Sequence, residues 1–295
     1  MTYTFRTARR SEAKPLIGLY AESGCGKTWS ALLLARGFAG PQGKIGMIET
    51  EGGRGEAYVG RDPVGDYLVC PIRGSFAPAA YGDAITAAEE AALDVLIIDS
   101  ASHEWEGAGG VLSMAAENQA NGVKGVLVWQ KPKIEHQRHF MLRLMQTPIP
   151  LVIVCMRAKY PMVQVPGKSE WSRSTQLEPK QADDILFEMM IHGWIDQAHN
   201  LHVTKYTLPE LASVMEDGKP ITLETGQRLA AWARGEEGTR KIDDFIEWDT
   251  KLQTAAHNGI DALAAEWKLV PRHLQTALKS NLDTIHKPAA AKVAA

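Results

Sequence analysis

The residues best suited to chemistry form one short glycine-rich segment, Ala21-Glu22-Ser23-Gly24-Cys25-Gly26-Lys27-Thr28. Glycines allow a tight turn in which backbone N–H groups can surround a phosphate without obstruction by a Cβ atom. In such a loop Lys27 reaches the β and γ phosphates of a nucleotide, and the Thr28 hydroxyl holds Mg²⁺. The usual first glycine is Ala21 here, a change that removes no phosphate ligand. The segment, with Trp29 directly after it, therefore predicts a nucleotide-binding loop.

The sequence on either side of this loop supports the prediction. An apolar run, residues 15–20, precedes the loop and an amphipathic run, residues 29–38, follows it, which together indicate a strand, a turn and a helix. The first turn of that helix would add its positive dipole end to the phosphate site. A chance Gly-Lys-Thr in an ordinary strand-to-helix turn is the alternative, and this context disfavours it.

A second candidate, Asp99, falls at the carboxyl end of an apolar strand predicted over residues 93–100. Ligands bind an open parallel sheet at the carboxyl ends of its strands, so we expect Asp99 at the same edge as the glycine-rich loop. There it can meet the Mg²⁺ held by Thr28 through a water molecule. The alternative is an acid that merely caps a buried strand, and the presence of the loop upstream favours the metal role.

A third predicted strand, residues 43–48, ends in Glu49-Thr50-Glu51 and brings two carboxylates to the same edge. Many ATPases with such a loop place a water-activating glutamate directly after the strand aspartate, but that residue is Ser100 here. The chain resembles the RecA superfamily of strand-exchange ATPases, whose motif of apolar residue, acid, small residue and glutamate carries the catalytic glutamate in its last position. The resemblance implies that Glu51 is the catalytic base. The alternative is an acidic strand end that solvates the turn.

The order of these motifs implies a fold and an activity. The resemblance implies an α/β fold, with a RecA-like P-loop NTPase core, a mostly parallel central sheet, an antiparallel hairpin at its end and a small C-terminal helical domain. Within the superfamily, the chain looks most like the short phage-encoded ATPases of single-strand annealing. This likeness implies ATP and Mg²⁺ as cofactors, single-stranded DNA and a single-stranded-DNA-binding protein as partners, a homo-oligomer, and annealing or strand exchange in DNA recombination.

Two other functions fit the same motifs. A nucleotide-driven motor or loader for phage DNA replication or packaging would prefer duplex DNA and would not anneal strands. A non-catalytic, ATP-gated switch would bind ATP and a protein partner without turning the nucleotide over. Turnover with and without single-stranded DNA separates the three.

Charge is distributed unevenly along the chain, although the net charge is −3. Residues 124–180 carry ten Lys and Arg against three Glu, which indicates a local positive face suited to a phosphate backbone. A buried strand is predicted over residues 150–156, and the resemblance implies that Arg157 and Lys159 just after it stand where the γ phosphate is sensed. The loop beyond is expected to touch DNA with cations and a stacking ring. This DNA-contacting set is Lys159, Lys168, Trp171, Arg173 and Lys180.

The alternative for this loop is a solvated hairpin whose tryptophan packs back on the core. After it, residues 184–191 and 201–205 are predicted to be two strands of an antiparallel hairpin that finishes the sheet. Lys205 lies on the second strand. The resemblance implies that it can serve as the cation that one subunit places against the γ phosphate of the next, and a solvated strand-end lysine is the alternative.

The domain organisation follows from composition shifts. We expect an N-terminal arm (1–14), the ATPase core (15–234), a linker at Gly235-Glu236-Glu237-Gly238, a C-terminal helical domain (239–287) and a disordered tail (288–295). Phe5-Arg6-Thr7-Ala8 has the Phe-x-x-Ala spacing with which some recombinases of this superfamily dock onto a neighbouring subunit, although a frayed terminus is the simpler interpretation.

Composition indicates a cytoplasmic protein, within the host cell if it is phage-encoded. The chain of 295 residues is 45% hydrophobic, has no apolar run of membrane-spanning length and no secretion signal at its start. Its three cysteines, an odd number without metal-site spacing, fit a reducing compartment. Cys25, near a helix start, could be a reactive thiol, but a small residue at a variable loop position is favoured. His136 and His139 have metal-like spacing without a third ligand, so a solvated or DNA-facing helix surface is favoured for them.

Overall fold

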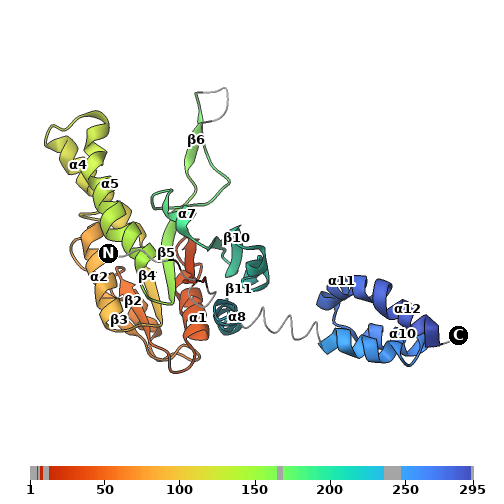
Figure 1. Ribbon diagram of the computed structural model, residues 1–295. Helices are drawn as coiled ribbons and strands as arrows, with labels where there is room; N and C mark the ends of the chain where they lie inside the picture. Colours follow the sequence, from red (N-terminus) through yellow and green to blue (C-terminus); the bar gives the residue numbers. More distant parts are fainter. Residues whose placement is uncertain (1–4, 6, 9–12, 165–168, 236–246, 294–295) are drawn as a thin grey trace. The chain divides into compact units, whose positions relative to one another are not determined.

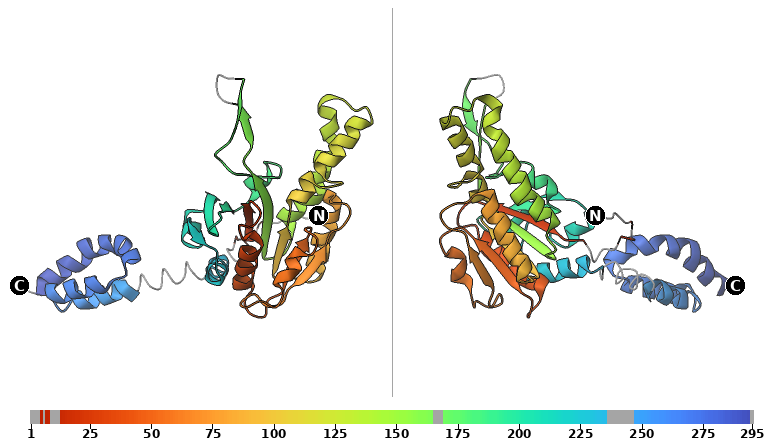
Figure 2. Two further views of the ribbon diagram at one scale, coloured as in Figure 1. Left: turned by 180° about the vertical axis from the view of Figure 1, so that it is seen from behind. Right: turned by 60° about the vertical axis from the view of Figure 1, so that its left-hand side comes forward.

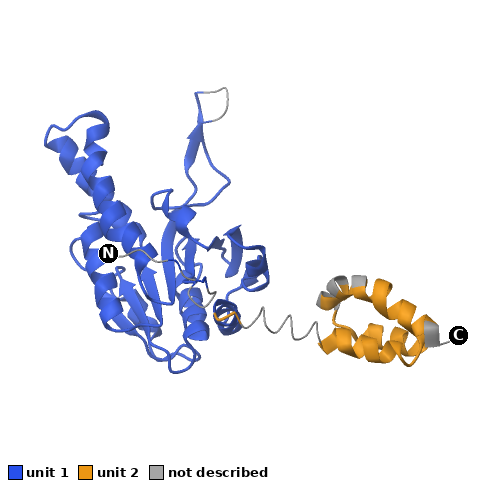
Figure 3. Ribbon diagram, in the orientation of Figure 1, with its two compact units in different colours: residues 1–233 blue, residues 234–295 orange. Residues whose placement is uncertain are grey.

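The segments predicted as apolar strands assemble into one mostly parallel sheet in the computed structural model, which describes residues 5, 7–8, 13–164, 169–235 and 247–293 (Figure 1). The chain divides into two compact units, Met1–Ala233 and Arg234–Ala295 (Figure 3). Across the described ranges, no helix combines the length and the apolar character needed to cross a bilayer.

The sheet of the first unit has the strand order β11-β10-β9-β1-β5-β4-β2-β3. Its parallel strands are β1 (Leu16–Ala21), β2 (Ile45–Glu49), β3 (Leu68–Pro71), β4 (Val95–Asp99), β5 (Leu151–Lys159) and β9 (Ile191–Ile195). The strands that run antiparallel to a neighbour are β10 (Asn200–Tyr206), β11 (Lys219–Pro220) and β8 (Glu178–Pro179), the last paired with β5. The α/β fold class expected from the sequence, with a mostly parallel sheet, a terminal antiparallel hairpin and C-terminal helices, is confirmed.

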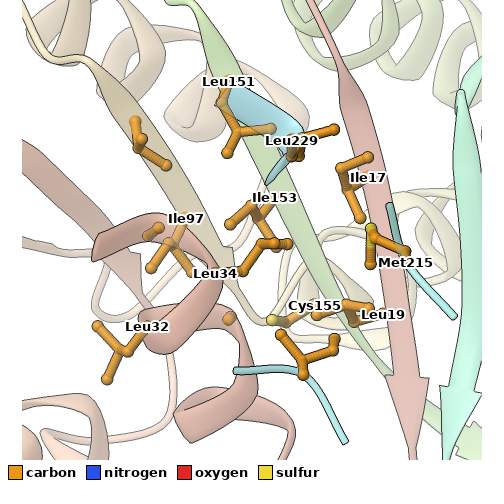
Figure 4. Packing of buried hydrophobic residues seen from close by; sticks show 14 of the residues in the cluster. Ile17, Leu19, Leu32, Leu34, Ile97, Leu151, Ile153, Cys155, Met215 and Leu229 are labelled. Atoms are coloured by element: carbon orange, nitrogen blue, oxygen red, sulfur yellow. The ribbon is translucent and has the colours of Figure 1, made fainter. Parts of the chain in front are cut away.

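Helices cover both faces of this sheet, so the central strands are buried on both sides and their sequences are continuously apolar. On one face Ile17, Leu19 and Ile153 pack against α1 (Lys27–Ala39) and α8 (Leu223–Ala233) (Figure 4). The alternate residues of the same strands pack on the other face with α2 (Pro78–Glu90) and a long helical segment that contains Phe140. Both clusters have members that are completely buried.

Two projections leave this layered core. The first is helical and consists of α4 (Val111–Ala120), the 3₁₀ turn η3 (Gly125–Trp129) and α5 (Gln130–Glu135). The π-helical η4 (His136–Met141) and α6 (Leu142–Gln146) follow it and pack in the core. The second is the thin antiparallel hairpin of β6 (Met162–Gln164) and β7 (Trp171–Arg173), which stands out from the sheet in both views of Figure 2. Residues 165–168, which include Lys168 of the expected DNA-contacting set, lie outside the described residues.

The terminal hairpin differs from the sequence prediction at its first strand. The prediction of a strand from residue 184 is wrong, because Ile185–Glu188 forms the short helix α7 and β9 begins at Ile191. Ile185 and Met189 are buried while Phe187, between them, is 76% exposed, which is a helical and not an alternating pattern. Likewise β5 continues to Lys159, so Arg157 and Lys159 lie within the strand and not after it.

The second unit forms a small helical cluster of its own. Its helices are residues 247–256, α10 (Ile260–Leu269), α11 (Arg272–Asn281), η6 (Leu282–His286) and α12 (Lys287–Val293). The disordered tail expected from residue 288 is wrong up to residue 293, because α12 forms there and buries Ala290 in this cluster. Residues 236–238 of the expected linker and Arg6 of the N-terminal motif lie outside the described residues, and Phe5 is fully exposed.

Helices α1 and α8 touch backbone to backbone at two glycines, Gly37 and Gly226. A Cβ atom at Gly37 would collide with the carbonyl oxygen of Leu223 and the Cα of Gly226. We therefore expect Gly37→Ala to lower the free energy of unfolding by about 1–3 kcal/mol, the usual cost of overpacking a close contact. Urea denaturation measures this change, with the exposed α4 substitution Gln119→Ala as a control that should stay within about 0.5 kcal/mol. Equal stability of the two variants would show that the helices can separate without cost.

Candidate nucleotide-binding site

The glycine-rich loop connects β1 to α1, as its composition requires. Ala21 is the last residue of β1 and Lys27 the first of α1. Between them Gly24 and Gly26 have φ angles of 88° and 81°, a left-handed conformation that other residues adopt only under strain. The N-terminal end of α1 therefore opens toward the carboxyl edge of the sheet, where its unpaired N–H groups favour an anion.

Strand order brings Asp99 to this loop. β5 lies between β1 and β4, and Cys155 of β5 pairs in register with Leu19 on one side and Asp99 on the other. The Thr28 hydroxyl donates a hydrogen bond to Asp99 Oδ2 at 2.5 Å, and Lys27 Nζ lies 3.8 Å from Asp99 Oδ1. Three side chains from segments 71 residues apart thus meet at one point.

The charges at this point balance each other inside the protein. Burial lowers the pKa of Lys27. The negative charges of nearby carboxylates, Asp99 first and then Glu51, outweigh this effect, so the pKa of Lys27 is raised above its ordinary value. The side chains of Lys27 and Asp99 are 11% and 6% exposed. A permanently charged ammonium group beside the loop suits a phosphate, because it can neutralise the incoming negative charge at short range.

The residues present fit a magnesium ion. Asp99 Oδ1 is buried and has no hydrogen-bond partner among the described residues, while a hydroxyl oxygen and a second carboxylate oxygen lie directly beside it. Mg²⁺ prefers oxygen ligands and is usually held by one or two protein groups, water and substrate phosphates. Thr28 and Asp99 would hold the ion, which would offset the charge of a bound phosphate. Within the described part of the chain, no group of three or more His, Cys, Asp or Glu is arranged to hold a metal.

The two glutamates after β2 have different environments. Glu49 is buried, accepts hydrogen bonds from the backbone N–H groups of Glu51 (2.7 Å) and Gly53 (3.0 Å), and pairs with Arg73 at 2.7 Å. Its carboxylate is fully engaged in shaping the turn. Glu51 instead lines the cavity beside the glycine-rich loop, where Arg54 lies 3.6 Å from its carboxylate. The accessible carboxylate of the pair is therefore that of Glu51.

Beside these residues lies a cavity of about 650 Å³, which is within the usual size of about 300–1,000 Å³ for a small-molecule site. Its floor is the loop from Glu22 to Thr28 with Trp29. Glu51 and Arg157 line its sides, and His199 with residues 220–222 lines it from the far end of the sheet.

Sequence analysis did not identify His199 or residues 220–222. His199 lies in the turn between β9 and β10, and its Nδ1 is 2.9 Å from the carbonyl oxygen of Cys25, 174 residues away. Pro220 ends β11, which pairs with β10. Neither position carries a local motif, because both reach the cavity through strand pairing over long sequence distances.

The other predicted site residues are more scattered. Arg157 lines the cavity and lies 3.6 Å from Glu106, which also pairs with Lys180 at 3.3 Å. Lys205 is outside the cavity lining, and its ammonium group donates to the carbonyl oxygens of Leu186 (3.3 Å) and Phe187 (2.8 Å) at α7.

The described residues of the β6–β7 hairpin do not line the cavity, but one of them contacts a residue of the cavity floor. Trp171 is 63% exposed and does not pack back on the core. Arg173 stacks over the ring of Tyr160 at 4.5 Å and lies 3.7 Å from the carboxylate of Glu22, which belongs to the glycine-rich loop. Lys159 is exposed at the end of β5.

The surface interpretation of His136 is wrong. His136 is 2% exposed and its Nδ1 lies 2.9 Å from Glu104 Oε1, since it shares the helix face that also buries Pro132 and Phe140. Burial lowers the pKa of His136, but the hydrogen bond and the charge of Glu104 outweigh burial and raise the pKa above its ordinary value. His139 is partly exposed and lies 3.5 Å from Glu135.

Comparison with known proteins gives likenesses to solved structures alone. No family model and no curated protein matches the chain. Among solved structures, the chain is similar to a KaiC-like protein from the hyperthermophilic archaeon Pyrococcus horikoshii, with 15% sequence identity and a TM-score of 0.35. The likeness covers 65% of this chain and 79% of that one.

The thiols provide a test of the site's burial. Cys25 lines the cavity yet is 3% exposed, and its pKa is raised by burial and then by the carboxylates of Glu22 and Asp196. Burial also raises the pKa of Cys155, whereas Cys70 is half-buried. Because the thiolate is the reactive form, iodoacetamide at pH 7.5 should label Cys70 about tenfold faster than Cys25. Mass spectrometry of digested samples measures the rates, with Cys70→Ser as a control, and faster labelling of Cys25 would contradict this account of the loop.

Proposed function

We propose that this chain is a Mg²⁺-dependent, RecA-like P-loop ATPase that couples ATP binding and hydrolysis to the binding, annealing or exchange of single-stranded DNA. The observation that carries the ATPase part is that Lys27 and Thr28, which line a nucleotide-sized cavity, both contact the buried carboxylate of Asp99. The resemblance of the motif order to the RecA superfamily supports the choice of ATP and of DNA.

Each residue at the cavity has a chemical role in this proposal. Lys27 and the backbone N–H groups of the loop would bind the triphosphate. Thr28 and Asp99 would hold the ion that offsets charge on the transferred phosphoryl group. Glu51 would accept the proton of the attacking water, and Arg157, which also lines the cavity, would stabilise the charge that develops on the γ phosphate.

The exposed hairpin supports the DNA part. β6 and β7 project from the sheet and present Trp171 and Arg173 to solvent, an aromatic ring next to a cation. Two contacts join this region to the cavity. Arg173 pairs with Glu22 of the loop, and Glu106 joins the cavity residue Arg157 to Lys180 beyond the hairpin. A change at the nucleotide can therefore reach the hairpin through side chains that are in contact.

Hydrolysis should depend on Glu51 far more than binding does. We expect Glu51→Gln to bind ATP as tightly as the natural chain and to lose about 10²- to 10⁴-fold in turnover, the usual contribution of a general base. Equilibrium binding of a fluorescent ATP analogue and phosphate release measure the two quantities. Glu56→Gln, an exposed change in the same segment, is the matched control. Unchanged turnover in Glu51→Gln would remove this residue from the mechanism, and ATP binding without turnover in the natural chain would favour a non-catalytic switch.

Single-stranded DNA should bind the hairpin. We expect Trp171→Ala to weaken binding of an oligonucleotide about tenfold through loss of stacking, and Arg173→Ala to reduce the salt dependence by about one phosphate contact. Fluorescence anisotropy at several salt concentrations measures both effects. Phe187→Ala, an exposed aromatic residue outside the hairpin, should change neither. If affinity and salt slope are unaltered in both hairpin variants, the hairpin is not the DNA contact, and stronger stimulation of turnover by duplex DNA would favour a motor.

A further inference from the structure

A second cavity, of about 600 Å³, opens where the helical projection meets the chain just after the hairpin. Its lining includes Trp105, from α3 (Ser102–Glu106), and Trp129, from the end of η3. His136 and Asp184 lie in its lining, and Lys133 and Asp183 are exposed members of that lining. None of these residues lines the nucleotide cavity.

Two polar atoms at this cavity form an ion pair without a hydrogen bond. His136 Nε2 lies 3.6 Å from Asp184 Oδ1, which is too long for a hydrogen bond. Both atoms are buried and have no hydrogen-bond partner among the described residues. The other polar atom of each side chain already has a partner. His136 Nδ1 pairs with Glu104, and Asp184 Oδ2 accepts a hydrogen bond from Gln137. Buried polar groups without partners are uncommon and costly, so this pair calls for a ligand that presents a donor next to an acceptor.

The apolar part of the cavity suits a flat ring. The indole of Trp105 meets the His136 ring edge to face, with centroids 5.5 Å apart. Trp129 is half-buried in a turn whose neighbours Val126 and Leu127 are exposed. Two half-buried indoles can stack on a ring, and the polar pair beside them can form hydrogen bonds with the edge of that ring. Proteins use these two interactions to hold a nucleobase that has left its stack.

We propose that this cavity receives an unstacked base of bound single-stranded DNA, an inference that rests on the proposed function. The base would stack on Trp129 and Trp105 and present its pairing edge to His136 and Asp184. Every nucleobase has a donor beside an acceptor on that edge, so the cavity would accept all four bases. Lys133 would pair with the phosphate outside, since it is the exposed cation of the lining.

The position of the cavity connects it with both parts of the proposed function. Its lining residues 181–184 directly follow Lys180 in the chain, and Lys180 pairs with Glu106, which is next to the lining residue Trp105. The side-chain amide of Gln181 donates to the carbonyl oxygen of Ala101 (2.9 Å) and to Glu104 (3.2 Å). Ala101 and Glu104 belong to the segment that begins with Ser100, directly after Asp99. A base in the cavity would therefore contact Gln181, which is hydrogen-bonded to the segment after Asp99.

The decisive experiment compares DNA that has bases with DNA that lacks them. The full chain, with a non-hydrolysable ATP analogue, is titrated with a labelled oligothymidylate and with an abasic oligonucleotide of equal length. We expect Trp129→Ala to weaken binding of oligothymidylate about tenfold and to leave binding of the abasic strand unchanged, because only the former can stack. Trp129→Phe, which keeps a ring, should restore most of the affinity. Val126→Ala, an 84% exposed change in the same turn, is the matched control and should bind both strands normally.

The outcomes separate this inference from the function on which it rests. Normal binding of the ATP analogue by Trp129→Ala shows that the variant is folded. If the natural chain binds oligothymidylate and Trp129→Ala binds it equally well, or loses affinity equally for both strands, the base-binding cavity is overturned while the DNA-dependent ATPase stands. If the natural chain binds neither strand in any nucleotide state, the proposed DNA function fails and this inference fails with it.

Discussion

The structure of the first unit depends on one buried carboxylate, that of Asp99, and on the cation and hydroxyl held against it. A carboxylate at this depth is costly unless it is paired, and Lys27 and Thr28 supply the pairing from the other side of β5. The backbone around Asp99 is also fixed, since the Thr50 N–H donates to the Asp99 carbonyl and the Thr50 hydroxyl accepts from the Ser100 N–H. The loop, β4 and the turn after β2 are thus bound together before any ligand is considered.

The two glutamates after β2, Glu49 and Glu51, differ in what their carboxylates contact. The Glu49 carboxylate accepts hydrogen bonds from two backbone N–H groups and pairs with Arg73, and these interactions stabilise the turn. That turn then holds Glu51 at the cavity with its carboxylate accessible, 23% exposed and beside Arg54. A residue that is to exchange a proton with water needs this partial exposure, whereas a residue that positions the chain needs the burial of Glu49.

Sequence patterns indicated the parts of the site whose signals are local. The loop at residues 21–28 carries its own glycines, and the apolar run before Asp99 fixes a strand and its end, so both lie where strand order brings them together. Sequence patterns did not indicate His199 or residues 220–222. The pairing of β9, β10 and β11 brings them to the cavity, and this pairing has no local sequence motif. His136 was misjudged for a related reason, since its buried partner Glu104 lies 32 residues away in the chain and leaves no local signal.

The cations of the basic segment are held in a way that suits reversible binding. Arg157 and Lys180 share Glu106, and Arg173 rests against Glu22, with most of these side chains between a quarter and two thirds exposed. Pairs this exposed contribute about 0–1 kcal/mol each, because water screens them. In the proposed function, a phosphate backbone would therefore replace the carboxylates at small cost. Each replacement would free Glu22, which lines the cavity, or Glu106, which pairs with Arg157 of that lining. Strong buried pairs would prevent such an exchange.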